Sequence, residues 1–115
     1  MRRGEIVTIS LDPARGSEAT KTRPAVVVSN DAANATATRL GRGVVTVVPV
    51  TSNTARVYLF QVLLPARETG LPHDSKAQAE QVRSVAVERV GKRIGLLPQS
   101  LITELDQALR VHLSL

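Results

Sequence analysis

Apolar and polar residues alternate from Glu5 to Leu11. The side chains of Val7, Ile9 and Leu11 share one face of this segment, and the opposite face is mostly polar. A period of two residues predicts a half-buried β-strand. The Asp12–Pro13 step ends it, because proline has no N–H to donate to a strand ladder.

A second strand is predicted directly after Pro24, where the chain continues into a run of valines over 26–28. β-branched side chains pack well on a pleated surface. Pro24 fixes its own φ and biases Arg23 toward an extended conformation, so we expect the arginine at the mouth of a buried strand. Residues 29–31 read as a turn or helix cap, and residues 32–40 as one or two helical turns.

Further strands are predicted over Val44–Val50, Val57–Leu64, the second half of 76–87, and Val90–Leu97, with a turn over 70–75. After Pro98 the apolar residues recur at intervals of three and four, which predicts a C-terminal helix with Pro98 in its first turn. Short strands followed by one helix indicate a mainly β fold, a small antiparallel barrel covered by the C-terminal helix.

The chain has 115 residues, a length that predicts a single domain over 1–115. No apolar run is long enough to cross a bilayer and no signal peptide is visible, so we expect a cytoplasmic protein without a membrane partner. Fifteen Lys and Arg against ten Asp and Glu leave a net charge of +5, which favours a nucleic acid or an acidic protein as partner.

Arg23 is the first candidate for chemistry. It is either an ordinary surface arginine before a strand or a guanidinium fork that grips a phosphate through paired hydrogen bonds. The loop before it supplies polar groups able to close over a bound strand, namely Ser17, Glu18, Thr20 and Lys21.

The second candidate is the polar cluster Thr51, Ser52, Asn53 and Thr54 at the end of the 44–50 strand. These residues either satisfy local amides in a turn or donate to phosphate oxygens. In a small barrel this strand end can lie beside the start of the Pro24 strand, which would bring Arg23 and Thr51 together.

A third group combines Asp74 and Ser75 with the segment 80–84. Glu80 and Arg83 are either a surface ion pair of little energetic value or part of a binding surface. If the segment is a strand, Gln81 and Arg83 share a face and line a groove. His73 is either an exposed turn residue or a general base.

Several site types are missing from the sequence. It contains no cysteine, no glycine-rich phosphate loop, no nucleophile elbow and no cluster of metal-binding carboxylates, so we expect neither a metal nor another cofactor. Its aromatic residues are only two, Tyr58 and Phe60. Proteins that bind single strands without sequence preference use several aromatic side chains for base stacking, so this class of function is not favoured.

Taken together, these motifs resemble the MazF/PemK family of toxin endoribonucleases. The resemblance runs along nearly the whole chain, in order and spacing, through residues 2–6, 11–13 with 16–18, 23–31, 48–52, 74–75 with 80–84, and the apolar C-terminal helix.

The resemblance implies an SH3-like β-barrel that forms a homodimer and cuts single-stranded RNA at short preferred sequences without a metal. The RNA is messenger RNA, with ribosomal or transfer RNA as alternatives. Arg23 and Thr51 match the family's catalytic pair, and the 2′-OH would attack the adjacent phosphate to leave a 2′,3′-cyclic phosphate and a 5′-OH. Because a guanidinium stays protonated, we expect Arg23 to stabilise charge on the phosphate rather than to move protons.

From the residues themselves we expect contacts with RNA at the loop residues Ser17, Glu18, Thr20 and Lys21, and at Ser52, Asn53, Asp74, Ser75, Gln81 and Arg83. Glu18 is a candidate general base. The implied protein partner is an antitoxin with an acidic segment that covers the RNA groove.

A rival reading is a non-enzymatic CcdB-like toxin of the same barrel type, which binds DNA gyrase through its C-terminal end. Residues 112–115 look here like helix packing, which favours the nuclease.

Overall fold

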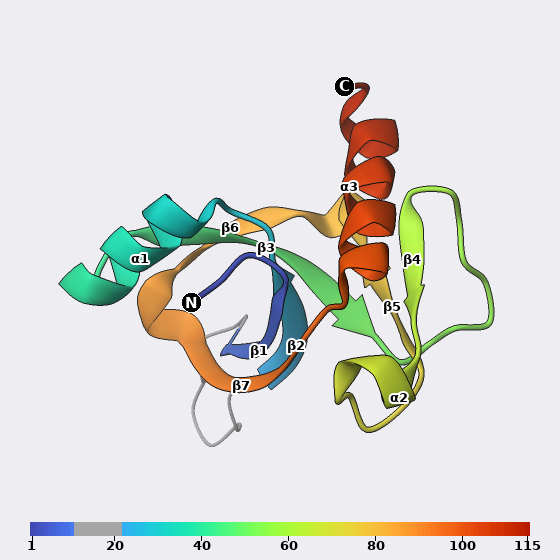
Figure 1. Ribbon diagram of the computed structural model, residues 1–115, viewed down its shortest axis with the longest axis horizontal. Helices are drawn as coiled ribbons and strands as arrows, with labels where there is room; N and C mark the ends of the chain where they lie inside the picture. Colours follow the sequence, from blue (N-terminus) through green and yellow to red (C-terminus); the bar gives the residue numbers. More distant parts are fainter. Residues whose placement is uncertain (11–21) are drawn as a thin grey trace, which may run out of the picture.

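The strands of the protein form one antiparallel sheet with a helix standing on it (Figure 1). The computed structural model describes residues 1–10 and 22–115. The strands are β1 (Glu5–Ser10), β2 (Thr22–Val27), β3 (Val44–Thr51), β4 (Gln61–Leu64), β5 (Ser75–Gln78), β6 (Arg83–Ala86) and β7 (Val90–Leu96). The helices are α1 (Asp31–Leu40), α2 (Ala66–Thr69) and α3 (Gln99–Leu113), with single 3₁₀ turns η1 (Ala79–Gln81) and η2 (Val87–Arg89).

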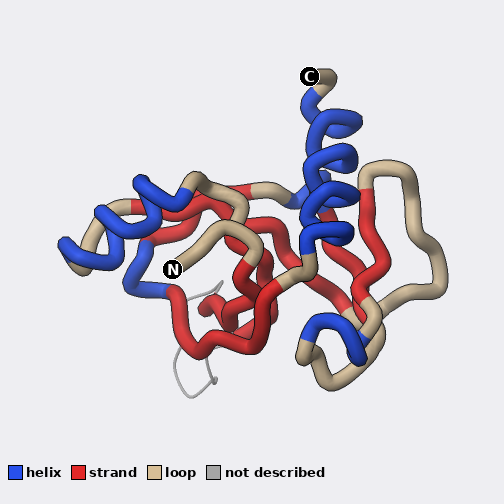
Figure 2. The backbone as a smooth tube through the Cα atoms, viewed as in Figure 1, coloured by secondary structure: helices blue, strands red, loops and turns tan. Residues whose placement is uncertain are grey.

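The strand order is β4-β5-β3-β2-β1-β7, and β6 also pairs with β3. β3 is therefore the central strand: β2 lies along one edge, and β6 and β5 share the other edge in succession. The sheet is strongly curved, and β1, β2 and β7 wrap around one end of it (Figures 1 and 2). The prediction of a mainly β, barrel-like fold with a C-terminal helix is confirmed.

Both faces of the central strands are buried, because successive side chains enter two different hydrophobic clusters. Val26 and Val48 belong to a cluster that α3 covers with Leu101, Leu105 and Ala108. Their neighbours Ala25, Val27, Val45 and Val47 belong to a second cluster, which α1 closes with Ala37. In β1, Ile6 enters the first cluster while Val7 and Ile9 enter the second, so the predicted alternation is correct but both faces are apolar at this end.

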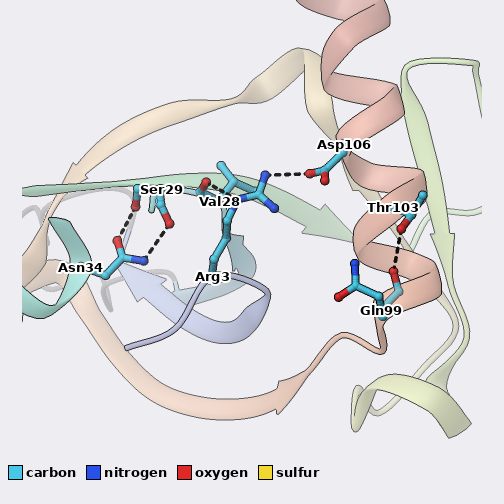
Figure 3. A network of polar contacts seen from close by, with 7 residues as sticks. All are labelled: Arg3, Val28, Ser29, Asn34, Gln99, Thr103 and Asp106. Carbon is cyan, nitrogen blue, oxygen red and sulfur yellow. Dashed lines mark hydrogen bonds and ion pairs between the residues drawn. The ribbon is translucent and has the colours of Figure 1, made fainter. Parts of the chain in front are cut away.

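Arg3 ties the N-terminus to α3 (Figure 3). Its Nε donates to the carbonyl oxygen of Val28 at 2.8 Å, and its Nη2 donates to Oδ1 of Asp106 at 2.7 Å. The same view shows Ser29 and Asn34 bonded at the start of α1. These contacts join the first residues, the end of β2 and two helices into one rigid corner.

Three local predictions are wrong. β2 begins at Thr22, so Arg23 lies within the strand rather than before it. Of the predicted strand 57–64 only Gln61–Leu64 is extended, because a turn precedes it. Residues 112–115 do not pack against the fold: all are exposed, Leu115 to 84%. The strand predicted in the second half of 76–87 is confirmed as β6, and the first half of this stretch forms β5 and η1.

The helices also differ in detail from the expectation. α1 has ten residues instead of one or two turns, because Asn30 caps its N-terminus and Gly41 ends it in the left-handed region at φ 66°. Pro98 is the N-cap of α3, one position before the predicted first turn. None of the helices within the described ranges is long and apolar enough to cross a membrane.

β7 continues through Gly91 and Gly95. A Cβ at Gly95 would lie 2.2 Å from the carbonyl oxygen of Thr69, in α2. The glycine therefore allows α2 to sit directly on β7.

Candidate functional site

A pocket of about 390 Å³ opens where β2, β3 and the segment before β5 meet. Its lining residues are Thr22, Arg23, Pro24, Val50, Thr51, Ser52, Leu71, Pro72, His73 and Ser75. Three segments far apart in the sequence thus contribute to one concave surface. The chemistry-bearing side chains among them are an arginine, a histidine and several hydroxyls.

The pairing of β2 with β3 places Arg23 close to Thr51. The register of this pairing joins Ala25 to Pro49, Val26 to Val48 and Val27 to Val47. Continued two residues past the Ala25–Pro49 pair, it sets Arg23 opposite Thr51, and directly opposite side chains on an antiparallel pair lie on the same face. The predicted meeting of these two residues is confirmed, because both also line the pocket.

The local sequence explains why both side chains stay at the surface. Arg23 precedes Pro24, which cannot donate to a ladder, and it lies at the exposed start of β2. Thr51 is the last residue of β3, and its Oγ1 accepts a hydrogen bond from the backbone N–H of Asn53 at 3.3 Å. Buried residues follow Arg23 in β2 and precede Thr51 in β3, and they fix the backbone at both positions.

The opposite wall of the pocket comes from the turn before β5. Leu71 is buried and anchors this turn to the core, while His73 is exposed at the pocket. Ser75 is buried, and its hydroxyl donates to the carbonyl oxygen of His73 at 2.9 Å. Arg23 and His73 are the ionisable side chains among the described lining residues.

The remaining sequence candidates do not line this pocket among the described residues. Asp74 accepts a hydrogen bond from the backbone N–H of Ala66 at 2.9 Å and so stabilises the start of α2. Asn53 accepts one from the N–H of Ala55. Both therefore have local structural partners.

Gln81 and Arg83 do not share a strand face, because Gln81 belongs to η1 and β6 begins at Arg83. Arg83 is paired in register with Val47 instead. Glu80, which the sequence reading placed beside Arg83, accepts a hydrogen bond from Nε2 of Gln61 at 2.7 Å. Ser17, Glu18, Thr20 and Lys21 lie outside the described residues.

Sequence reasoning missed Lys76, which the fold places next to Thr51. The two residues are register partners on β3 and β5, and their side chains therefore lie on one face. Lys76 is only 8% exposed, and its Nζ donates to the carbonyl oxygen of Arg56 at 2.6 Å. The only sequence signal is a lysine between Ser75 and Ala77 in a stretch that can form a strand.

This arrangement suits chemistry on a phosphodiester. Arg23 offers a planar fork of donors, and the hydroxyls of Thr51 and Ser52 offer further donors from an adjacent strand. The imidazole of His73 lies on the same pocket wall as Ser75 and adds a nitrogen acceptor or donor.

Comparison with known proteins agrees with this reading. Residues 2–113 match the family described as PemK-like, MazF-like toxin of type II toxin-antitoxin system. The chain is 67% identical over 115 residues to the endoribonuclease MazF9 of Mycobacterium tuberculosis, covering 100% of this chain and 98% of that protein. It is 37% identical over 114 residues to the endoribonuclease MazF6 of the same species, covering 98% of this chain and 96% of that protein. Its fold is similar to the crystal structure of MazE-MazF (Form-II) from Deinococcus radiodurans, with a TM-score of 0.78, 28% identity, and coverage of 100% of this chain and 96% of that one.

Proposed function

We propose that this protein cuts single-stranded RNA at the pocket of Arg23 and Thr51. The chain belongs to the PemK-like, MazF-like family of toxins of type II toxin–antitoxin systems and is an endoribonuclease toxin. The observation that supports this site is the convergence of Arg23, Thr51 and His73 on one pocket from three separate segments. Cleavage at short preferred sequences without a metal belongs to the same proposal.

In the proposed reaction the ribose 2′-oxygen attacks the adjacent phosphorus, and the bond from phosphorus to the 5′-oxygen of the next nucleotide breaks. The products are a 2′,3′-cyclic phosphate and a 5′-OH. Negative charge accumulates on the non-bridging oxygens as the fifth bond forms. In this proposal the donors of Arg23 and Thr51 stabilise that charge, and donors aimed at developing charge supply a large part of enzymatic rate enhancement.

The proton of the 2′-OH needs an acceptor, and a guanidinium is not one. Among the described lining residues His73 is the side chain suited to take it, because an imidazole ring nitrogen with a free lone pair is a common general base. The leaving 5′-oxygen takes a proton from water or from the same imidazole. Glu18, the acceptor considered from sequence, lies outside the described residues.

The proposed partners follow from the same assignment. As a toxin of a type II system the protein has an antitoxin partner, and a net charge of +5 makes an acidic antitoxin segment and RNA natural ligands. We include a homodimer and a cytoplasmic site of action, where the RNA substrate is found. Because its relatives are named endoribonucleases, the gyrase-binding alternative is not favoured.

The test is cleavage of mixed single-stranded RNA by the purified protein in EDTA, followed by analysis of the new ends. We expect cyclic phosphate and 5′-OH ends, and loss of cleavage in folded Arg23→Ala and Thr51→Ala variants. Arg39→Ala removes the same charge from α1, which does not line the pocket, and is the matched control. Absence of cleavage across diverse RNAs, or undiminished cleavage by Arg23→Ala, would overturn the proposal.

A further inference from the structure

The loop between β3 and β4 carries both aromatic residues of the protein, and they are stacked. The rings of Tyr58 and Phe60 lie 5.2 Å apart between centroids, with an angle of 3° between their planes. The guanidinium carbon of Arg56 lies 5.1 Å from the centroid of the Tyr58 ring. Alternate residues of the loop thus assemble one cation and two parallel rings, which we call the Arg56–Tyr58–Phe60 stack.

The stack is at the surface although it consists of groups that normally gain from burial. Tyr58 is 44% exposed, and its neighbours Val57 and Leu59 are exposed as well. In Figures 1 and 2 the loop runs along the outer side of β4, at the edge of the sheet. An exposed apolar surface of this kind marks a binding site more often than a structural need.

Two buried polar side chains hold the loop in this conformation. Lys76 donates from Nζ to the carbonyl oxygen of Arg56 at 2.6 Å. Gln61 accepts from the backbone N–H of Tyr58 at 3.1 Å through Oε1 and donates to Glu80 at 2.7 Å through Nε2. Lys76 and Gln61 are each 8% exposed. Burying two polar groups to fix an exposed loop indicates that the ring positions are preorganised for a ligand.

The stack is connected to the proposed cleavage site through Lys76. Thr51 and Lys76 are register partners, and the ammonium group of Lys76 reaches the loop at Arg56. A strand that presents a phosphate to Arg23 and Thr51 can therefore continue past Lys76 onto the stack. Single-stranded nucleic acids are held in this way, by cations along the backbone and rings under the bases.

We propose that the Arg56–Tyr58–Phe60 stack binds a nucleobase of the same single-stranded RNA, close to the nucleotide that is cut. This inference rests on the proposed function, since it assigns a further subsite to the RNA at the pocket. The ligand is an unpaired base of any identity, because every base presents a π-face. The positive charge of Arg56 adds an attraction that suits RNA and its phosphates.

The first step maps the cut sites in a natural transcript. The second step measures binding of an oligonucleotide that contains one of these cut sites. This oligonucleotide carries deoxyribose at the nucleotide whose 2′-OH would attack, so that it is bound but not cut. Tyr58→Leu and Phe60→Leu should weaken its binding by about 5- to 100-fold, the range of a lost base–ring stack. Leu59→Ala, in the same loop and 87% exposed, is the control and should change affinity less than about twofold.

A series of abasic oligonucleotides locates the base. One abasic position near the cut should weaken binding to the wild type and have no further effect on the Tyr58→Leu, Phe60→Leu double variant. Equal binding by the double variant and the wild type would overturn the proposal. So would a double variant that loses affinity only for the antitoxin, because the stack would then be a protein contact.

Failure of the cleavage proposal is recognised separately. If the wild type cuts no RNA, a pool of random single-stranded DNA still tests the stack by binding, with the same variants. A different result would contradict the base-binding proposal alone. In that case the wild type cuts RNA and Arg23→Ala does not, which supports the cleavage site, but the ring variants bind RNA as tightly as the wild type.

Discussion

Thr51 and Lys76 are partners in the antiparallel ladder of β3 and β5, and both side chains lie on the sheet face that carries the candidate site. Arg23 follows on the other side of Thr51 in the continued register of β2 and β3. Thr51 thus lies between Arg23 of β2 and Lys76 of β5 in the order of the ladder.

Lys76→Met should weaken binding of an uncut RNA by about 3- to 10-fold, because it removes one cation beside Thr51 and the bond that fixes Arg56. The salt dependence is the sharper measurement: loss of one phosphate contact lowers the slope of log affinity against log salt by about 0.7 for single strands. Lys92→Met removes an exposed lysine on β7 and is the charge-matched control. An unchanged slope would show that Lys76 serves the loop alone.

Arg23→Lys should lose nearly as much cleavage as Arg23→Ala, about 100-fold or more, although the charge is kept. The reason is geometric, because an ammonium group cannot present the paired donors of a guanidinium fork to one phosphate. Single-turnover cleavage rates measure this effect, with Arg39→Lys as the control. A variant with wild-type rates would reduce Arg23 to a simple point charge.

His73→Gln should lower the single-turnover cleavage rate by about 10²- to 10⁴-fold, the usual contribution of a general base. Glutamine keeps the approximate size and polarity of the side chain but cannot take up a proton. RNA affinity should change little, which separates a role in the reaction from a role in binding. Undiminished cleavage would transfer the proton-accepting role to another group.

Leu105→Ala should destabilise the fold by about 2–5 kcal/mol, because Leu105 is buried between α3 and the sheet and its loss leaves a cavity. Val111→Ala, on the exposed final turn of the same helix, should cost less than about 0.5 kcal/mol in the isolated chain. Urea unfolding measures both. A large effect of Val111→Ala would indicate that the helix end is covered, as in a dimer.

Gly95→Ala should destabilise the protein by about 1–3 kcal/mol, because the new methyl group meets the carbonyl oxygen of Thr69 and pushes α2 off β7. The space around Gly41 is open, and there the cost of alanine is only that of a positive φ, about 1 kcal/mol. Thermal unfolding compares the two variants. Equal stabilities would mean that α2 moves away from β7 at no cost.

The local patterns predicted the strands with β-branched runs and the last helix correctly, since those elements depend on periodicity that is visible in the chain itself. The predicted strand over 57–64 was wrong in its first half, where the β-prone residues Val57 and Tyr58 lie in a loop. Gln61 closes a local turn with Tyr58, and Lys76, from the distant strand β5, bonds the carbonyl oxygen of Arg56. The alternation of apolar residues along 57–64 does not reveal the bond to Lys76, because that bond depends on the tertiary structure.

Residue types and motif order were sufficient to select Arg23 and Thr51 and to indicate a phosphate-binding, RNA-cutting protein. The tertiary structure decided which candidates meet. Arg23, Thr51, His73 and Ser75 line one pocket. Asp74 instead bonds the start of α2, and Lys76 pairs with Thr51. The physical reason is the strand register. Side-chain alternation follows from local sequence, but which residue lies opposite which is set only when the strands pair around two shared cores.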